Sequence, residues 1–200
     1  MKFRNVDVRG NSKDPNRGKW CTPKPIADAV GPFDLDAFSN PRSHIVTRER
    51  CMLEDGGDGF GDGKTPGSYR CGIGQLKTAS SDTLFWGQPP YERGFVQRAF
   101  DHYRHTRWCF LLRFDPRPDW WRAVYAAAEL VAVIDVEFEP PPGVPKGGGN
   151  SFPHALYYRY AKDVTEAVLR MAAAVWRKKA LERHRALVDD HELPSEWSAP

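Results

Sequence analysis

The stretch Leu84-Phe85-Trp86-Gly87-Gln88-Pro89-Pro90-Tyr91 joins an apolar strand to a rigid turn. The two prolines have no backbone N–H and each fixes φ near −65°, so strand pairing must stop where they begin. They also push Gln88 and Pro89 away from helical conformations. The turn then presents a side-chain amide, two carbonyls and an aromatic ring beyond the end of the strand. These groups suit a planar ligand that carries an amine, although a purely structural corner between a strand and a helix has the same sequence pattern.

Helices and strands alternate on both sides of this turn. Downstream, the spacing of apolar residues predicts a helix over 92–105, the buried strand Trp108–Leu112, a helix from Pro118, the buried strand Val131–Ile134 and a strand over 154–160. Upstream, Thr22-Pro23 predicts a helix start with Thr22 as N-cap, and Phe33–Phe38 alternates like a strand. This alternation predicts an α/β fold, with a mostly parallel open sheet and helices on both faces.

The remaining segments set the expected limits of the domain. Residues 1–19 are predicted to be a flexible N-terminal arm, 20–190 a single domain and 191–200 a C-terminal tail. The Gly- and Asp-rich segment Glu54–Gly74 is predicted to be a long loop or insertion with little regular structure. A last helix is predicted over 164–188, with five apolar residues on its inner face: Val168, Leu169, Ala172, Val175 and Trp176.

The composition is typical of a globular protein outside the membrane. Of 200 residues, 40% are hydrophobic and 28% charged, and the net charge of +3 permits nucleic-acid binding without requiring it. The four cysteines are scattered without a CxxC pair, so no metal site is expected. No apolar run approaches the ~20 residues of a membrane span, and the first residues lack the apolar core of a signal peptide. These features predict a cytoplasmic protein.

Three motifs occur in a fixed order along the chain. Trp20-Cys21-Thr22-Pro23 precedes Phe33-Asp34-Leu35-Asp36-Ala37, and Phe85–Tyr91 follows both. The series resembles the phage-type, Dam-like DNA N-6-adenine methyltransferases, which have a WxTP element, an FDLD strand and an NPPY or DPPY motif in this order. The resemblance implies a Rossmann-like methyltransferase fold, S-adenosyl-L-methionine as the cofactor and double-stranded DNA as the partner. For a phage-encoded enzyme, the compartment would be the cytoplasm of the bacterial host.

The resemblance also implies roles for individual residues. The target adenine would be flipped out of the duplex and stacked on Tyr91. The Gln88 side-chain oxygen and the Pro89 carbonyl would accept hydrogen bonds from its amine, and Pro90 would keep the turn rigid. Two acceptors orient the nitrogen lone pair toward the methyl group and stabilise the positive charge that develops on nitrogen. The residues implied to border the cofactor are Thr22, Pro23, Asp36, Ala37 and Asp58.

Gln88 departs from the pattern of the family, which has Asn or Asp at this position. Gln keeps the amide acceptor but adds a methylene, which displaces the oxygen by about 1.5 Å, and a misplacement of ~1 Å can cost ~100-fold in rate. Three interpretations remain open. The protein methylates adenine with an adjusted pocket, methylates a different amine, or is a degenerate scaffold that binds DNA or another partner without catalysis.

Several assignments have simpler structural alternatives. Asp36 fits a solvent-facing position on an edge strand as well as a cofactor contact, and Asp58 fits a turn in a Gly-rich loop. The loop that carries Lys146 and Asn150 is either a DNA contact or a plain connection. The basic series Arg177-Lys178-Lys179, with Arg183 and Arg185, is either a solvated helix face or a patch that contacts phosphates.

Overall fold

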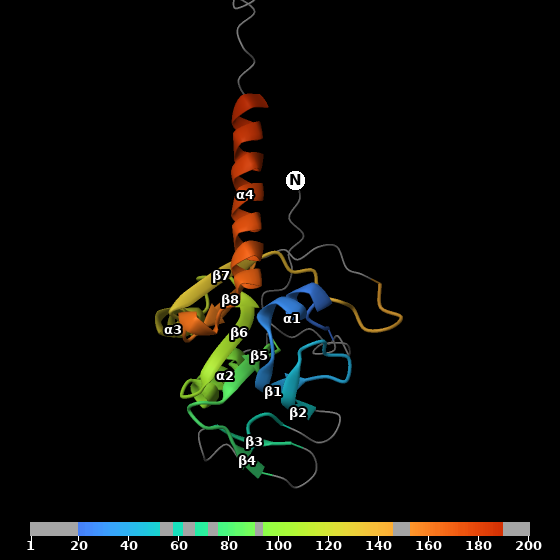
Figure 1. The fold of residues 1–200 in the computed structure, drawn as a ribbon, viewed down its shortest axis with the longest axis vertical. Helices are drawn as coiled ribbons and strands as arrows, with labels where there is room; N and C mark the ends of the chain where they lie inside the picture. The colour runs from blue at the N-terminus through green and yellow to red at the C-terminus, as the bar shows by residue number, and fades with distance from the viewer. Residues whose placement is uncertain are drawn as a thin grey trace, which may run out of the picture.

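The centre of the structure is a sheet of six strands in the order β2-β1-β5-β6-β8-β7 (Figure 1). The computed structural model describes residues 20–52, 58–61, 67–71, 76–90, 94–145 and 153–189. The predictions for the arm, the C-terminal tail, Tyr91, Lys146 and Asn150 concern positions outside the described residues. The strands of the sheet are β1 (Phe33–Ser39), β2 (Thr47–Met52), β5 (Leu84–Gly87), β6 (Arg107–Arg113), β7 (Leu130–Ile134) and β8 (His154–Tyr158).

Four neighbouring strands of this sheet are parallel, and one strand is reversed. β2, β1, β5 and β6 run in the same direction, whereas β8 lies antiparallel between β6 and β7. β6 occupies a central position because Trp108–Leu112 is apolar on both faces and fully buried. The predicted α/β class with a mostly parallel sheet is confirmed. The reversal of β8 was not predicted, because periodicity shows that a strand forms and not which way it runs.

Helices cover both faces of the sheet, as predicted. α1 (Lys24–Val30) and α4 (Glu166–Asp189) pack on one face, and α2 (Phe95–Tyr103) and α3 (Asp119–Ala127) pack on the other. The short 3₁₀ helix η2 (Ala161–Asp163) precedes α4. Successive residues of one strand therefore serve opposite layers: Phe85 packs toward α2 and Trp86 toward α1.

A small second sheet interrupts the connection between β2 and β5. β3 (Ser68–Arg70) and β4 (Leu76–Thr78) pair antiparallel, and Figure 1 shows them at the end of the molecule opposite α4. Glu54–Gly74 was predicted to have little regular structure; β3 lies within it and was not predicted, because three residues are too few to give a periodic signal. β2 was also missed, because its charged centre hides any alternation. It forms at the edge of the sheet by pairing with β1 alone.

α4 contacts the sheet only with its first half. Val168 is buried, Met171 and Ala172 are partly buried against the same core cluster, and Val175 is partly buried against the other. Leu169 and Trp176, predicted to face inward, are 48% and 60% exposed. They were misplaced because their spacing fits a helix, but they lie about 100° around the helix from Val168 and beyond the edge of the packed side. The rest of α4 stands out from the body in Figure 1. Across the described residues, no helix combines the length and apolarity that crossing a membrane demands.

The strand order defines where a ligand is expected. β1 is followed by its neighbour β2 on one side, whereas β5 is followed by β6 on the other, so the order reverses between β1 and β5. In open α/β sheets, ligands bind beyond the carboxyl ends of the strands at such a switch point. The strands concerned end at Ser39 and Gly87. Both predicted motifs, the FDLD strand and the turn of Gln88, lie at this point.

Candidate functional site

Thr22 and Gln88 are in contact at the switch point. The hydroxyl of Thr22, which is 3% exposed, donates a hydrogen bond to the side-chain oxygen of Gln88. This bond joins the segment before α1 to the turn after β5, across 66 positions in the chain. Two of the three sequence motifs therefore meet through side chains. A carbonyl oxygen has two lone pairs, so the Gln88 oxygen keeps one further acceptor direction.

Thr22 is not the N-cap of α1, which corrects the prediction. The N-cap is Pro23, and the helix begins at Lys24. The Pro23 carbonyl accepts the first bonds of the helix from Ile26 N and Ala27 N, each at 3.0 Å. The hydroxyl of Thr22 therefore has a different task from capping, because it is directed to Gln88 and not to the first turn of the helix.

Glu139 holds the segment that carries Thr22 from the other side. Cys21 and Glu139 exchange two backbone hydrogen bonds of 3.0 Å. The Glu139 carboxylate lies 2.8 Å from His44 Nε2 and accepts a bond from Lys24 N at 3.3 Å. The bond with His44, more than that with Lys24, holds the pKa of Glu139 below its usual range. Glu139 thus fixes the start of α1 to the loop that follows β1.

Asp36 is a buried carboxylate near the end of β1. It is 2% exposed, and β1 is an inner strand, so the alternative of a solvent-facing residue on an edge strand is wrong. Burial raises the pKa of Asp36 to about 6, although hydrogen bonds and the charge of Arg50 act in the opposite direction. Its oxygens accept bonds from Phe38 N at 3.3 Å and from the Ser43 hydroxyl at 3.4 Å. The carboxylate therefore carries an uncompensated cost of burial.

The side chain of Asp36 lies on the same face of the sheet as α1. Leu35 and Ala37 belong to the layer of α2, and side chains alternate along a strand. Asp36 also pairs in register with Trp86, two residues before Gln88. A buried carboxylate and the Gln88 amide thus end two adjacent strands on one face. A ligand that brings an ammonium or hydroxyl group to Asp36 would offset the cost of the buried charge.

Asp58 lies by the other face of the same strand end. Its Oδ1 accepts bonds from Phe60 N at 3.0 Å and Gly61 N at 2.6 Å, so the predicted turn role is confirmed. Gly59 (φ +67°) approaches the Ala37 carbonyl so closely that a Cβ would collide with it. The turn is therefore built around the end of β1, with Ala37 buried beneath it. These contacts do not decide whether Asp58 also binds a cofactor, so that role stays a prediction.

The turn after β5 is packed rather than loose. β5 ends at Gly87, directly before Gln88, as the two prolines predict. A Cβ at Gly87 would collide with the Phe110 ring of β6, so glycine allows this close approach. Pro89 is buried, whereas Gln88 and Pro90 are half-buried. The Gln88 amide is therefore presented from a fixed backbone.

Some residues of the site carry no recognisable signal in the sequence. Ser43, His44, Arg50 and Glu139 shape the surroundings of Asp36 and Thr22, yet each lies outside the three motifs. Tertiary contacts alone bring them in. Among the described residues, no group of three or more His, Cys, Asp or Glu side chains is placed to hold a metal ion.

The site offers acceptor groups in two places: a buried carboxylate at Asp36 and an amide oxygen at Gln88. Such a surface suits a ligand with cationic or hydroxyl donors next to a second ligand with an amine. Comparison of the chain with protein-family models, with curated proteins and with solved structures finds no match.

Proposed function

We propose that the protein transfers a methyl group from S-adenosyl-L-methionine to the exocyclic N-6 amine of a flipped adenine in duplex DNA. The proposal includes a Rossmann-like methyltransferase fold, with which the mostly parallel sheet and its switch point are compatible. The observation that carries it is the hydrogen bond from Thr22 to Gln88. It joins the WxTP element to the PPY turn at the place where such a sheet binds ligands.

The acceptor groups of the site suit the cofactor. When bound, S-adenosyl-L-methionine supplies an electrophilic methyl group, together with ammonium and ribose hydroxyl donors. Asp36 would accept from one of these donors, because its charge is buried and its pKa is raised. Pro23 and Thr22 would border the methionine end, while Ala37 and Asp58 would border the remainder near the end of β1.

Gln88 would position the amine of the target base. Its oxygen would accept one N–H of the amine with the lone pair that Thr22 leaves free, and the Pro89 carbonyl would accept the other. The bond from Thr22 also fixes the position of the Gln88 side chain. It would thereby compensate for the extra methylene that Gln has relative to Asn or Asp. Because a fixed acceptor needs no reorganisation during the reaction, this arrangement stabilises the charge that develops on nitrogen.

The proposal is tested by incubating the purified protein with methyl-labelled cofactor and duplex DNA of mixed sequence. We expect label in the DNA, and N-6-methyladenine after digestion to nucleosides and mass spectrometry. A folded protein that transfers no label to any sequence would refute the proposal. Label in another nucleoside would instead support methylation of a different amine.

A second candidate is a DNA- or partner-binding protein that has lost catalysis. It is favoured by the same bond, because Thr22 already occupies one acceptor direction of Gln88. Calorimetric titration with S-adenosyl-L-methionine separates the two candidates. The enzyme releases or absorbs heat on binding and transfers label, whereas a degenerate scaffold without a cofactor site gives no heat.

A further inference from the structure

The outer part of α4, from Trp176 onward, is a helical segment that leaves the sheet. The last described ion pair along it joins Lys178 Nζ to Asp135 Oδ2 at 3.9 Å, just beyond the end of β7. From Lys178 to Asp189 the helix continues for about 16 Å at 1.5 Å per residue. Figure 1 shows this part standing clear of the sheet.

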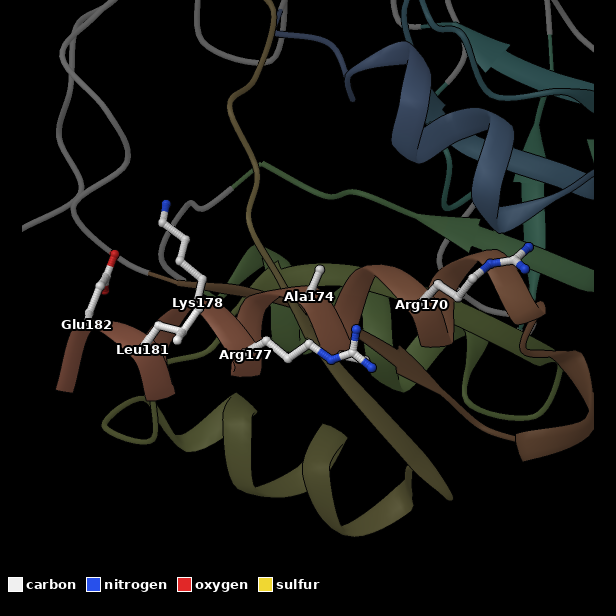
Figure 2. Close-up of a pocket in the computed structure, with 7 residues that line it drawn as sticks. Arg170, Ala174, Arg177, Lys178, Leu181 and Glu182 are labelled. Carbon is white, nitrogen blue, oxygen red and sulfur yellow. The ribbon is translucent and has the colours of Figure 1, made fainter. Parts of the chain in front are cut away.

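Positive charge is concentrated on this part of the helix. Residues 177–185 contain five Arg or Lys residues and a single acidic residue, Glu182. Arg177, Lys178 and Lys179 are all exposed. Figure 2 shows Arg177 and Lys178 extending from the helix in different directions. Neither Arg177 nor Lys179 has an ion pair within the part of the chain that the structure describes. Lys178 has the carboxylate of Asp135 at 3.9 Å and Lys179 has the Trp176 ring, so these charges are only weakly neutralised within the described residues.

An exposed aromatic ring accompanies the charges. Trp176 is 60% exposed, and Lys179 Nζ lies 5.8 Å from the centre of its ring. Tryptophan normally buries most of its large apolar area, so this ring is available for contact from outside the molecule. The surface in Figure 2 is a different side of α4 from Trp176; it is formed by α4 residues alone, among them Arg177 and Lys178, and is an open face of the helix. Its shape suits a partner that is approached from outside rather than a ligand that is enclosed.

The charge distribution selects among possible partners. A second copy of this helix would bring two strongly basic segments together, which is unfavourable. Binding to a membrane surface requires one continuous apolar face. Leu181 follows Trp176 by five residues and Leu169 by twelve, so it lies on a different side of α4 from both. The phosphates of DNA provide the opposite charge at close intervals, and exposed Arg and Lys side chains are their usual contacts.

We propose that residues 176–182 of α4 form an arm that binds the phosphate backbone of duplex DNA. The choice of duplex DNA rests on the proposed function, whereas binding itself does not require methyl transfer. The arm contributes affinity that does not depend on sequence, and it leaves base recognition to the site at the switch point.

The test compares two variants of the full-length protein with equal net charge. One carries Arg177→Gln, Lys178→Gln and Lys179→Gln. The matched control carries Arg104→Gln, Arg122→Gln and Lys162→Gln, at positions that are exposed elsewhere on the molecule.

Binding to a fluorescent duplex of about 20 base pairs is followed by anisotropy between about 50 and 200 mM salt. The arm variant should lose about tenfold or more in affinity, and the slope of log K against log salt should fall by about 2 to 3. The control should stay within about twofold of the unmodified protein.

Three outcomes would overturn the inference. They are an equal loss in both variants, no binding by the unmodified protein at low salt, and a dimer in sedimentation that only the arm variant disrupts. Circular dichroism before each titration verifies that both variants are folded. Arm-dependent binding without methyl transfer would refute the proposed function and leave the arm standing. Methyl transfer without arm-dependent binding would do the reverse.

Discussion

The switch point and the outer part of α4 differ in how their polar side chains are held. At the switch point, Thr22 and Glu139 have partners far away in the chain, and Asp36 is buried between strands with partners from the loop and strand that follow it. Along the outer part of α4, Arg177 and Lys179 project from a helix that leaves the body. The comparison teaches that one region is organised by tertiary contacts and the other by charge alone. A substitution at the switch point should therefore act by displacing the side chains of the site. A substitution on the outer part of α4 should act by changing the charge of the helix.

The largest effect is expected at Gln88. Replacing Gln88 with Ala removes the proposed acceptor and should lower the rate of methyl transfer by about 1,000-fold, while cofactor binding stays intact. Single-turnover transfer and calorimetric titration measure the two properties separately. Gln88→Asn serves as the control, because it keeps the amide but shortens the reach to Thr22, and it should retain more activity than Ala. Equal activity of Gln88→Ala and the unmodified protein would refute the role.

Thr22 should have the next largest effect. Thr22→Val keeps the shape of the side chain but removes the hydroxyl that Gln88 accepts. We expect the maximal rate of transfer to fall by about 10- to 100-fold, because a misplaced acceptor weakens positioning. Thr22→Ser retains the hydroxyl and should keep most of the activity. If Val and Ser variants react alike, the bond does not position Gln88.

Asp36 should respond oppositely in stability and in binding. Its folded pKa of about 6 exceeds the value of 3.8 in the unfolded chain, so the native state binds the proton more tightly. The contribution of Asp36 to stability is thus most favourable below pH 4 and is lost as the pH rises through 6. Asp36→Asn should therefore raise the free energy of unfolding at pH 7.5 by about 2 kcal/mol, and this gain should vanish near pH 4.

The same substitution should weaken cofactor binding by about tenfold or more, since a charged acceptor is lost. In the unmodified protein, cofactor affinity should also decrease as the pH falls through 6. Denaturant titrations at both pH values and calorimetry check these expectations. A variant that is less stable at pH 7.5, with unchanged affinity, would show that Asp36 serves only the fold.

The smallest effect is expected on the outward side of α4. Val168 is fully buried, whereas its neighbour Leu169 is 48% exposed. Val168→Ala should lower the free energy of unfolding by about 2 kcal/mol, and Leu169→Ala by no more than about 0.5 kcal/mol. Denaturant unfolding of the two variants measures both values. A large cost at Leu169 would mean that this side of α4 is covered in solution.

Periodicity predicted the elements that have a strong apolar pattern. The strands over 33–38, 108–112 and 131–134 and the helix within 92–105 all occur, with their ends shifted by a few residues. β2 and β3 were missed, since one is charged at its centre and the other has three residues. In α4 the helix was predicted but its packed side was not, because Leu169 and Trp176 fit the same spacing as the buried residues.

The candidate site was predicted in part. The sequence named Thr22, Asp36 and Gln88, and the structure places them at the ends of adjacent elements. It could not show that Thr22 bonds to Gln88 rather than to the first turn of α1, because both uses suit a threonine before a proline. Contacts of Glu139 with Cys21, Lys24 and His44 join positions that are 95 or more residues apart and leave no local pattern.

The sequence by itself determined the α/β alternation, the end of β5 before Pro89 and Pro90, and the order of the three motifs. These depend on local properties, namely apolar spacing and the missing N–H of proline. Only the tertiary structure decided that Asp36 is buried, that Thr22 holds Gln88, and that Trp176 is exposed beside Lys179. Burial and side-chain partners depend on which elements become neighbours, and in this chain those neighbours are often separated by many tens of residues.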